Sequence, residues 1–447
     1  MSRLTLHRGS IFHLRDDPDN GAEAVEWLAD GALLIEDGHV AAVGEAAKVR
    51  APADAETIAH EGIIAPGFID AHVHYPQTDL IGADGKDLLD WLARYTFPAE
   101  SAFSDPAHAA ATAENFLDEL LRNGVTSAAV FATTHAVSAD AIFAAAEARN
   151  MRLISGKVLM DAHAPAALLD PPGGGIDESE ALIRRWHGKG RLHYAVTPRF
   201  ALTSSPLQLQ GAGRLLEAHS DVYMHTHLAE NVDECIHAVQ RHPGASDYLA
   251  IYERYGLSRA RSIFAHSVHL SADAFARLAS AEAAIAFCPT SNTFLGSGFF
   301  DLAAARRAGV GVALGTDVGG GTSFSMLATM AEAYKVGQTH KAPLNAFAAF
   351  YLATLGAARA LKLDDKLGNF AIGKEADFVV LDPAATPLLS RRACAAKSLH
   401  EMLFALMIMG DDRAVRETWI AGARAHARDD APPTPQKWRG PWLNRTI

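Results

Sequence analysis

The middle of the chain, from about residue 63 to 365, alternates eight short apolar runs with amphipathic stretches of helical character. Strands that alternate with helices imply a parallel sheet whose strands are joined by crossover helices. Eight such units over about 300 residues match a (β/α)8 TIM-type barrel, and a doubly wound sheet is the alternative for the same pattern. The runs span residues 64–75, 125–133, 153–160, 192–197, 222–227, 262–266, 284–288 and 310–317.

Both ends of the chain have the pattern of β-structure. At the N-terminal end, apolar runs flank Asp37-Gly38, a two-residue hairpin signal. Near the C-terminal end, residues 368–382 combine alternating polarity, turn glycines and a β-branched run. We therefore expect an α/β chain of two domains: a small β-sandwich domain with a proline-rich C-terminal tail, from residues 1–64 and 367–447, and a barrel of residues 65–366.

The composition is that of an ordinary globular protein and excludes several classes of function. The net charge of the 447 residues is −12, so the chain lacks the overall basic character of nucleic-acid-binding proteins. Its three cysteines form no Cys-x-x-Cys pair. The first residues lack the apolar core of a signal peptide, and the longest apolar run, 402–409, is too short to span a membrane. We expect a cytoplasmic protein without a nucleic-acid or membrane partner.

Two histidines end the first apolar run, in the sequence Pro66-Gly-Phe-Ile-Asp-Ala-His72-Val-His74. Residues two apart on a strand point to the same face, so both imidazoles can face the mouth of the barrel, where active sites of this fold form. Neutral imidazoles at this spacing suit zinc or another divalent transition metal. Taken alone, such a pair can also be two buried or solvated histidines.

Three further strand ends carry residues of the same chemistry. The fifth run ends in His225-Thr-His227-Leu-Ala-Glu230, the sixth in His266 and the eighth in Asp317. Alternation places His227 nearer the mouth and His225 below it, as a structural histidine. A carboxylate such as Glu230 can act as general base and then general acid, although acids are also common in the first turn of a helix. Together with the first histidine pair, these residues can hold one divalent ion and leave a position open for water.

The motifs together resemble the amidohydrolase superfamily. The resemblance rests on residues 66–74, His227, His266 and Asp317, covers essentially the whole chain, and implies a barrel with a β-rich domain formed by both ends. The pairing of His227 with Glu230 is similar to that of the mononuclear deaminase branch, which hydrolyses an exocyclic amine from a heterocycle. Within that branch, several motifs in order are most similar to those of the enzymes that act on guanine. These motifs are residues 74–77, 156–161, 197–200, 225–231, 288–292 and 315–324.

The resemblance implies a metal site and a catalytic group. One Zn²⁺ per chain would be bound by His72, His74, His227 and Asp317, and Fe²⁺ or Mn²⁺ would suit the same ligands. His266 would hold and polarise the catalytic water, or join the ligands. The catalytic residues would be Glu230, Asp317 and His266. Water would replace the amine of guanine, which gives xanthine and ammonia, in a homodimeric enzyme.

The resemblance also implies which residues hold the purine. They are Gln77, Arg199, Phe200, His227, Glu230 and Asp317. The chemistry agrees, because guanine presents acceptors along its edges, Arg199 supplies donors in a fixed fork, and Gln77 offers a donor and an acceptor. Phe200, or alternatively Trp91 or Phe97, could cover a face of the ring.

Three other functions compete with this hypothesis. A related deaminase would act on 8-oxoguanine, another aminated heterocycle such as a pterin or triazine, or a thio-adenosine nucleoside. A two-metal amide or ester hydrolase would need a carbamylated lysine, for which Lys157 is the only mid-strand candidate in the barrel. A scaffold that has lost its ligands is disfavoured, because every ligand-type residue and Glu230 are present.

Overall fold

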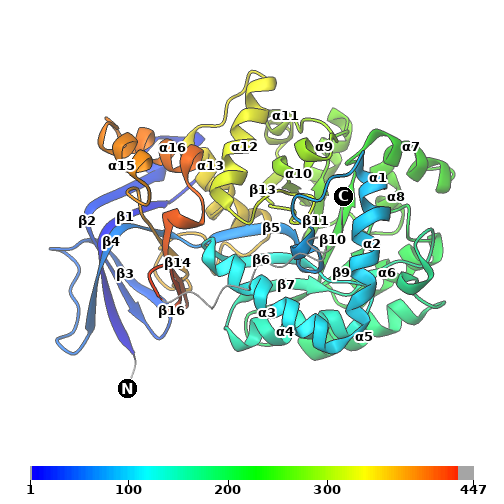
Figure 1. Ribbon diagram of the computed structural model, residues 1–447, viewed down its shortest axis with the longest axis horizontal. Coiled ribbons are helices and arrows are strands. Elements are labelled where there is room, and N and C mark those ends of the chain that lie inside the picture. Colours follow the sequence, from blue (N-terminus) through cyan, green and yellow to red (C-terminus); the bar gives the residue numbers. More distant parts are fainter. Residues whose placement is uncertain (1–2, 431–447) are drawn as a thin grey trace, which may run out of the picture.

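The computed structural model of the protein describes residues 3–430, and within them the strands form two sheets (Figure 1). The predicted proline-rich tail lies outside the described residues from position 431 onward. None of the described helices is both long and apolar enough to cross a membrane.

The larger sheet is the predicted parallel barrel. Its strands are β5 (Phe68–His74), β6 (Val125–Phe131), β7 (Arg152–Gly156), β9 (Leu192–Pro198), β10 (Tyr223–Leu228), β11 (Ser262–His266), β12 (Ala284–Phe287) and β13 (Gly311–Leu314), with the short β8 (Val158–Leu159) also paired to β9. Two backbone hydrogen bonds of 2.8 Å close the ring just beyond β13. The Asp317 N–H donates to the His72 carbonyl, and the His74 N–H donates to the Val318 carbonyl.

Helices follow the barrel strands and cover the outside of the barrel (Figure 1). The connection from β5 to β6 contains η3 (Tyr75–Leu80), α1 (Leu88–Trp91), the π-helical turn η4 (Leu92–Thr96), α2 (Phe97–Ser101), η5 (Ala102–Ser104) and α3 (Pro106–Arg122). The remaining helices of the barrel are α4 (Ala136–Ala148), η6 (Ala166–Leu168), α5 (Gly174–Trp186), α6 (Pro206–Ala218), α7 (Val232–Arg241), α8 (Tyr248–Arg254), α9 (Ala272–Ser280), α10 (Pro289–Phe294), α11 (Leu302–Arg307), α12 (Met326–Thr339), α13 (Ala346–Leu352) and α14 (Leu355–Ala360).

The smaller sheet combines strands from both chain ends, as predicted, and they lie together on one side of the barrel (Figure 1, blue and red). In spatial order the strands are β16 (Ala423–Ala427), β15 (Val415–Ile420), β14 (Phe378–Leu381), β4 (Glu56–Pro66), β1 (Leu4–Leu14), β2 (Val25–Glu36) and β3 (His39–Glu45). The short helices of this region are η1 (Pro18–Asn20), η2 (Ala22–Ala24), α15 (Pro387–Cys394), α16 (Leu399–Met409) and η7 (Asp412–Ala414). The domain limits near residues 64 and 366 remain a proposal.

The β-patterns of the two ends differ in how much of each is a strand. Asp37 and Gly38 both have positive φ and form the predicted two-residue turn between β2 and β3. In the C-terminal pattern, only β14 is a strand. Gly368 and Gly373 have positive φ, so the chain turns where the sequence alone suggested continuous alternation.

Two irregularities of the backbone determine which way the side chains of His72 and His266 point. Every barrel strand contributes to one cluster of mostly small apolar side chains, which includes Ala71 and Ala265. In a regular strand the next residues, His72 and His266, would face away from that interior. The register of β5 against β6 shifts around His72, and His266 has a φ of 68°. These two irregularities turn both imidazoles into the mouth of the barrel.

A network of buried charges joins the two sheets at the face opposite the mouth. Glu375, which precedes β14, accepts hydrogen bonds from Arg152 at 3.1 Å and from Arg191 at 2.6 Å. Arg152 Nη1 also donates to His193 Nε2, 2.7 Å away on β9. Burial and the neighbouring Arg152 lower the pKa of His193 to about 3, so this imidazole is neutral in the folded protein.

We expect this network to make stability fall with acidification. An unfolded histidine has a pKa of about 6.5, so below that pH the unfolded state binds a proton that folded His193 does not. The contribution of neutral His193 to the free energy of unfolding is therefore complete above pH 6.5. It declines as the pH falls towards 3, by at most about 1.4 kcal/mol per pH unit. We expect acidification from about pH 7 to 5 to lower the free energy of unfolding of wild type by about 2 kcal/mol more than that of His193→Gln, as measured by urea unfolding. Equal losses in both proteins would contradict the assignment.

Candidate active site

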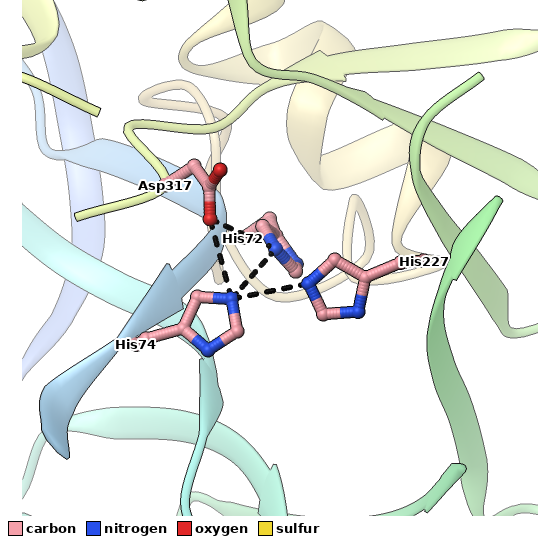
Figure 2. Close-up of side chains that lie close together, drawn as sticks. All are labelled: His72, His74, His227 and Asp317. Atoms are coloured by element: carbon pink, nitrogen blue, oxygen red, sulfur yellow. Dashed lines mark hydrogen bonds and ion pairs between the residues drawn. The ribbon is translucent and has the colours of Figure 1, made fainter. Parts of the chain in front are cut away.

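Four residues predicted as metal ligands come together at the mouth of the barrel (Figure 2). The Nε2 atom of His74 lies 3.1 Å from Nε2 of His72 and 3.2 Å from Nε2 of His227. Oδ1 of Asp317 lies 3.2 Å from the Nε2 atoms of both His72 and His74. The residues come from β5, from β10 and from the turn after β13, so the closed barrel itself brings them together. We call these four residues the ligand cluster.

The hydrogen bonds around the ligand cluster direct lone pairs into its centre. His227 Nδ1 donates to the Arg199 carbonyl at 2.7 Å, which leaves its Nε2 unprotonated. His72 Nδ1 lies 2.8 Å from Nε2 of His225, and donation in that direction frees Nε2 of His72 in the same way. His225 is therefore the structural histidine below the site that alternation predicted.

The charges of the ligand cluster suit a divalent cation. Burial lowers the pKa of His72 to about 3 and that of His74 and His227 below the ordinary value, so the imidazoles are neutral. Burial alone would raise the pKa of Asp317, but hydrogen bonds and charge from the histidines hold it well below its usual range. Ligand atoms of a tetrahedral zinc site are about 3.4 Å apart, which the observed spacings approach. Three lone pairs and one carboxylate oxygen facing a common point fit such an ion.

The backbone around the mouth is strained at four residues that are not glycine. Ala229, His266, Ser267 and Asp317 have φ values of 50°, 68°, 55° and 51°. A left-handed conformation costs such residues about 1–3 kcal/mol each and persists only where surrounding structure enforces it. The turn at Ala229 brings Glu230 back over the barrel, and the other three aim His266 and Asp317 into the site.

Glu230 and His266 form the second part of the site, beside the ligand cluster. Glu230 Oε2 lies 3.4 Å from His266 Nε2, and Ser297 Oγ donates to Glu230 Oε1 at 3.3 Å. Burial raises the pKa of Glu230 to about 7, with Asp317 adding to the rise and His266 opposing it. A carboxyl group with a pKa near neutrality is well suited to accept and return a proton at neutral pH.

His266 is held in one orientation relative to both carboxylates. Its Nδ1 donates to Oδ1 of Asn292 at 2.8 Å, so Nε2 faces Glu230 and lies 3.8 Å from Oδ2 of Asp317. Burial lowers the pKa of His266, but Glu230 and Asp317 outweigh burial and raise it overall. His266 lies outside the ligand cluster, next to the free oxygen of Asp317. This position suits a group that holds water between the two carboxylates.

A pocket with an empty volume of about 390 Å³ opens over these residues. All six residues predicted to hold the substrate line this pocket: Gln77, Arg199, Phe200, His227, Glu230 and Asp317. Leu88, Trp91, Leu92 and Leu295 supply apolar walls. Phe97 does not line the pocket, because its ring lies against the Arg199 guanidinium at 5.6 Å.

Three buried side chains that were not predicted from the sequence hold the site residues in place: Asn292, Glu234 and Glu100. Asn292 lies in the motif of residues 288–292, whose match to the family was a usable signal. Glu234 stands three residues after Asn231, which is the spacing of a helix capping box, whereas nothing in the sequence singled out Glu100. Glu234 accepts the Glu230 N–H at 2.9 Å. Glu100 contacts Gln77 and Arg199. Glu100 is a single acid inside a short helix, without a strand end or a paired residue to mark it.

Lys157 has no place in the candidate metal site. It is buried, forms an ion pair with Asp170 and donates to the Val158 carbonyl at 3.3 Å. Among the described residues, neither the ligand cluster nor the other possible ligand group, His266, Cys288 and Asp317, includes it. A lysine neutralised by its own carboxylate is unsuited to bridge two metal ions, which argues against the two-metal hydrolase.

Comparisons with known proteins agree with the geometry. A model of the amidohydrolase family matches residues 63–425. The chain is 47% identical to the guanine deaminase of Escherichia coli (strain K12) over 432 residues. These residues cover 95% of this chain and 98% of that protein. The solved structure of E. coli guanine deaminase has a TM-score of 0.92 at 45% identity, covering 95% of this chain and 99% of that one.

Two more distant structures contain bound ligands. Guanine deaminase from C. acetobutylicum with bound guanine has a TM-score of 0.85 at 27% identity, covering 94% of this chain and 100% of that one. An adenosine deaminase from Xanthomonas campestris with bound zinc has a TM-score of 0.82 at 26% identity, covering 96% of this chain and 94% of that one. By the family match and by its likeness to these relatives, the chain belongs to the amidohydrolase family.

Proposed function

We propose that this chain is a guanine deaminase, which hydrolyses guanine to xanthine and ammonia with one zinc ion per chain. One observation carries the proposal: donor and acceptor groups of Gln77 and Arg199 line a pocket that is also lined by three members of the ligand cluster and by Glu230. The relatives support it, since the most similar proteins reported above are guanine deaminases and one holds guanine. The zinc is supported by the donor set and by the adenosine deaminase with bound zinc.

The ligand cluster, His72, His74, His227 and Asp317, would hold the ion. A bound divalent cation acts as a Lewis acid and lowers the pKa of an adjacent water towards neutrality. The residues of the chain perform the remaining tasks, which are to hold the purine, orient the water and move protons.

The pocket suits a flat heterocycle with polar edges. Guanidinium N–H groups of Arg199 can donate to the carbonyl oxygen and ring nitrogens of guanine, and the Gln77 amide can donate and accept. Phe200 and Trp91 offer apolar surfaces to the ring. These contacts would leave the carbon that bears the amine facing Glu230 and His266.

Glu230 is placed to move the protons. In the proposed reaction Glu230 takes a proton from water as the water oxygen adds to the amine-bearing carbon. It then delivers that proton to the adjacent ring nitrogen. His266 Nε2 holds the water between Glu230 and Asp317. Asp317 Oδ2 and Glu230 then pass the hydroxyl proton to the amine, the C–N bond breaks and ammonia leaves. One water and one guanine thus give xanthine and ammonia.

A substrate panel tests the assignment of guanine. The zinc-loaded protein should have a kcat/KM for guanine at least about 100-fold above those for 8-oxoguanine, a pterin, an amino-triazine and methylthioadenosine. The reason is that each competitor lacks an edge that Gln77 and Arg199 would pair with, or carries bulk that the pocket must accommodate. Ammonia release, measured for every compound under the same conditions, gives the ratios. A higher kcat/KM for any competitor would transfer the proposal to that substrate.

A further inference from the structure

Glu100 is a completely buried carboxylate that touches both side chains proposed to bind the purine. It lies on α2, and its side chain has 0% exposure. Arg199 Nη1 donates to Oε1 and Oε2 of Glu100 at 2.9 and 2.7 Å. Gln77 Nε2 donates to Oε1 of the same carboxylate at 3.0 Å. The proposed function gives Glu100 no direct contact with substrate, so its role is open.

The first consequence of these bonds is orientation. The Gln77 amide is fixed at both ends, because its Oε1 also accepts the Gly319 N–H at 3.2 Å. Nη1 of Arg199 makes both of its bonds to Glu100, which leaves Nε and Nη2 to donate elsewhere. The Phe97 ring packs against the guanidinium at 5.6 Å. The purine edge would therefore meet donors and acceptors that are already held in place, which reduces the entropy lost on binding.

The second consequence concerns charge. Arginine does not lose its proton in proteins, so without Glu100 the pocket would contain an uncompensated buried cation. The paired carboxylate makes the sum of the two charges zero, in a pocket whose walls include Leu88, Trp91 and Leu92. A buried cation without its counter-ion would attract an anionic ligand strongly. A neutral pair gives no such advantage to anions.

We propose that Glu100 is a positioning and specificity residue, which orients Arg199 and Gln77 and makes the pocket prefer neutral purines over purine anions. The inference rests on the proposed function, because the neutral purine is guanine. It extends that function to product release, since xanthine loses a proton near neutral pH and its anion would be held by an unpaired Arg199. Glu100 therefore limits inhibition by the product.

The test compares Glu100→Gln and Glu100→Asp with wild type by calorimetric binding of two purines to the zinc-loaded proteins. Urate is the anionic probe at neutral pH, and hypoxanthine is the neutral probe. We expect the affinity ratio of urate to hypoxanthine to rise about tenfold or more in Glu100→Gln, because the buried Arg199 cation then lacks its counter-ion. Glu100→Asp retains the charge and should keep the wild-type ratio, while both affinities fall through lost positioning.

Kinetics provide a second readout that a purely structural role would not change. In Glu100→Gln, KM for guanine should rise about tenfold with a smaller change in kcat, and the Ki of xanthine should fall as pH rises through the xanthine pKa. Glu375→Gln is the matched control, because Glu375 is also a nearly buried acceptor for two arginines but lies at the opposite face. It should lower the melting temperature without changing the purine ratio.

The outcomes separate this inference from the proposed function. If wild type fails to deaminate guanine, the proposed function fails, while the binding ratio still reports whether Glu100 sets the charge preference. If Glu100→Gln does not fold, an unchanged ratio with weaker binding in Glu100→Asp supports the inference. An unchanged ratio and KM in Glu100→Gln, or unchanged affinities in Glu100→Asp, would overturn it.

Discussion

The Glu230→Gln variant is expected to lose guanine turnover by at least about 10²–10⁴-fold, the usual contribution of a general acid–base group. The amide cannot take a proton from water, and it cannot return one to the ring nitrogen. Glu230 lies outside the ligand cluster, so the variant should retain its metal. Stability should be equal or higher, since burial disfavours the carboxylate that the substitution removes.

Three measurements are needed to interpret this variant. Steady-state turnover gives the loss, elemental analysis gives the metal content, and the melting temperature excludes unfolding. Ser297→Ala is the companion variant, because it removes only the 3.3 Å hydrogen bond to Glu230 Oε1 and should cost about tenfold or less. If Glu230→Gln retains activity within tenfold of wild type, the proton must be carried by another group and the proposed mechanism is wrong.

Loss of the metal is expected to abolish turnover and to destabilise the fold. Chelator treatment, or substitution of a ligand as in His74→Ala, should reduce activity by at least about 10³-fold, because no other group at the site can replace a Lewis acid. The melting temperature should also fall by several degrees, since an ion that binds only the folded state stabilises it by mass action. Added Zn²⁺ should restore chelated wild type but not the variant.

The control for this experiment is His237→Ala, which removes an exposed histidine from α7 and should leave metal content and activity unchanged. Elemental analysis of wild type should give one ion per chain. Two ions per chain, or full activity after complete removal of metal, would contradict the account. Replacement of zinc by Fe²⁺ or Mn²⁺ measures how selective the ligand cluster is for its ion.

The barrel and the ligand cluster could be predicted because they follow from periodic patterns. Eight apolar runs defined the strands, and residues at the ends of parallel strands must converge when the barrel closes. The predicted strand end 310–317 shows this, since Asp317 follows β13 by three residues and its backbone closes the ring against His72. The chemistry of a metal site then depends on which residue types occupy those few positions.

The details that aim the side chains could not be predicted from alternation. Strict alternation places His266 opposite Ala265, and only its positive φ turns it into the site. The π-helical turn η4 and the short α2 place Glu100 beneath Gln77 and Arg199, and no periodic pattern marks such a segment. The position of Phe97 could not be predicted either. Its aromatic character suggested a cover for the purine ring, but its ring packs against the Arg199 guanidinium instead.

The central claim is that this chain removes the amine of guanine by hydrolysis. Purified protein loaded with one equivalent of Zn²⁺ should convert guanine to xanthine, with one ammonia released for each guanine consumed, as measured by chromatography and by an ammonia assay on the same samples. The Glu230→Gln protein with the same metal content serves as the background. Equal amounts of xanthine and ammonia above that background are the predicted result, and no xanthine from guanine with a fully metal-loaded, folded protein would contradict the account.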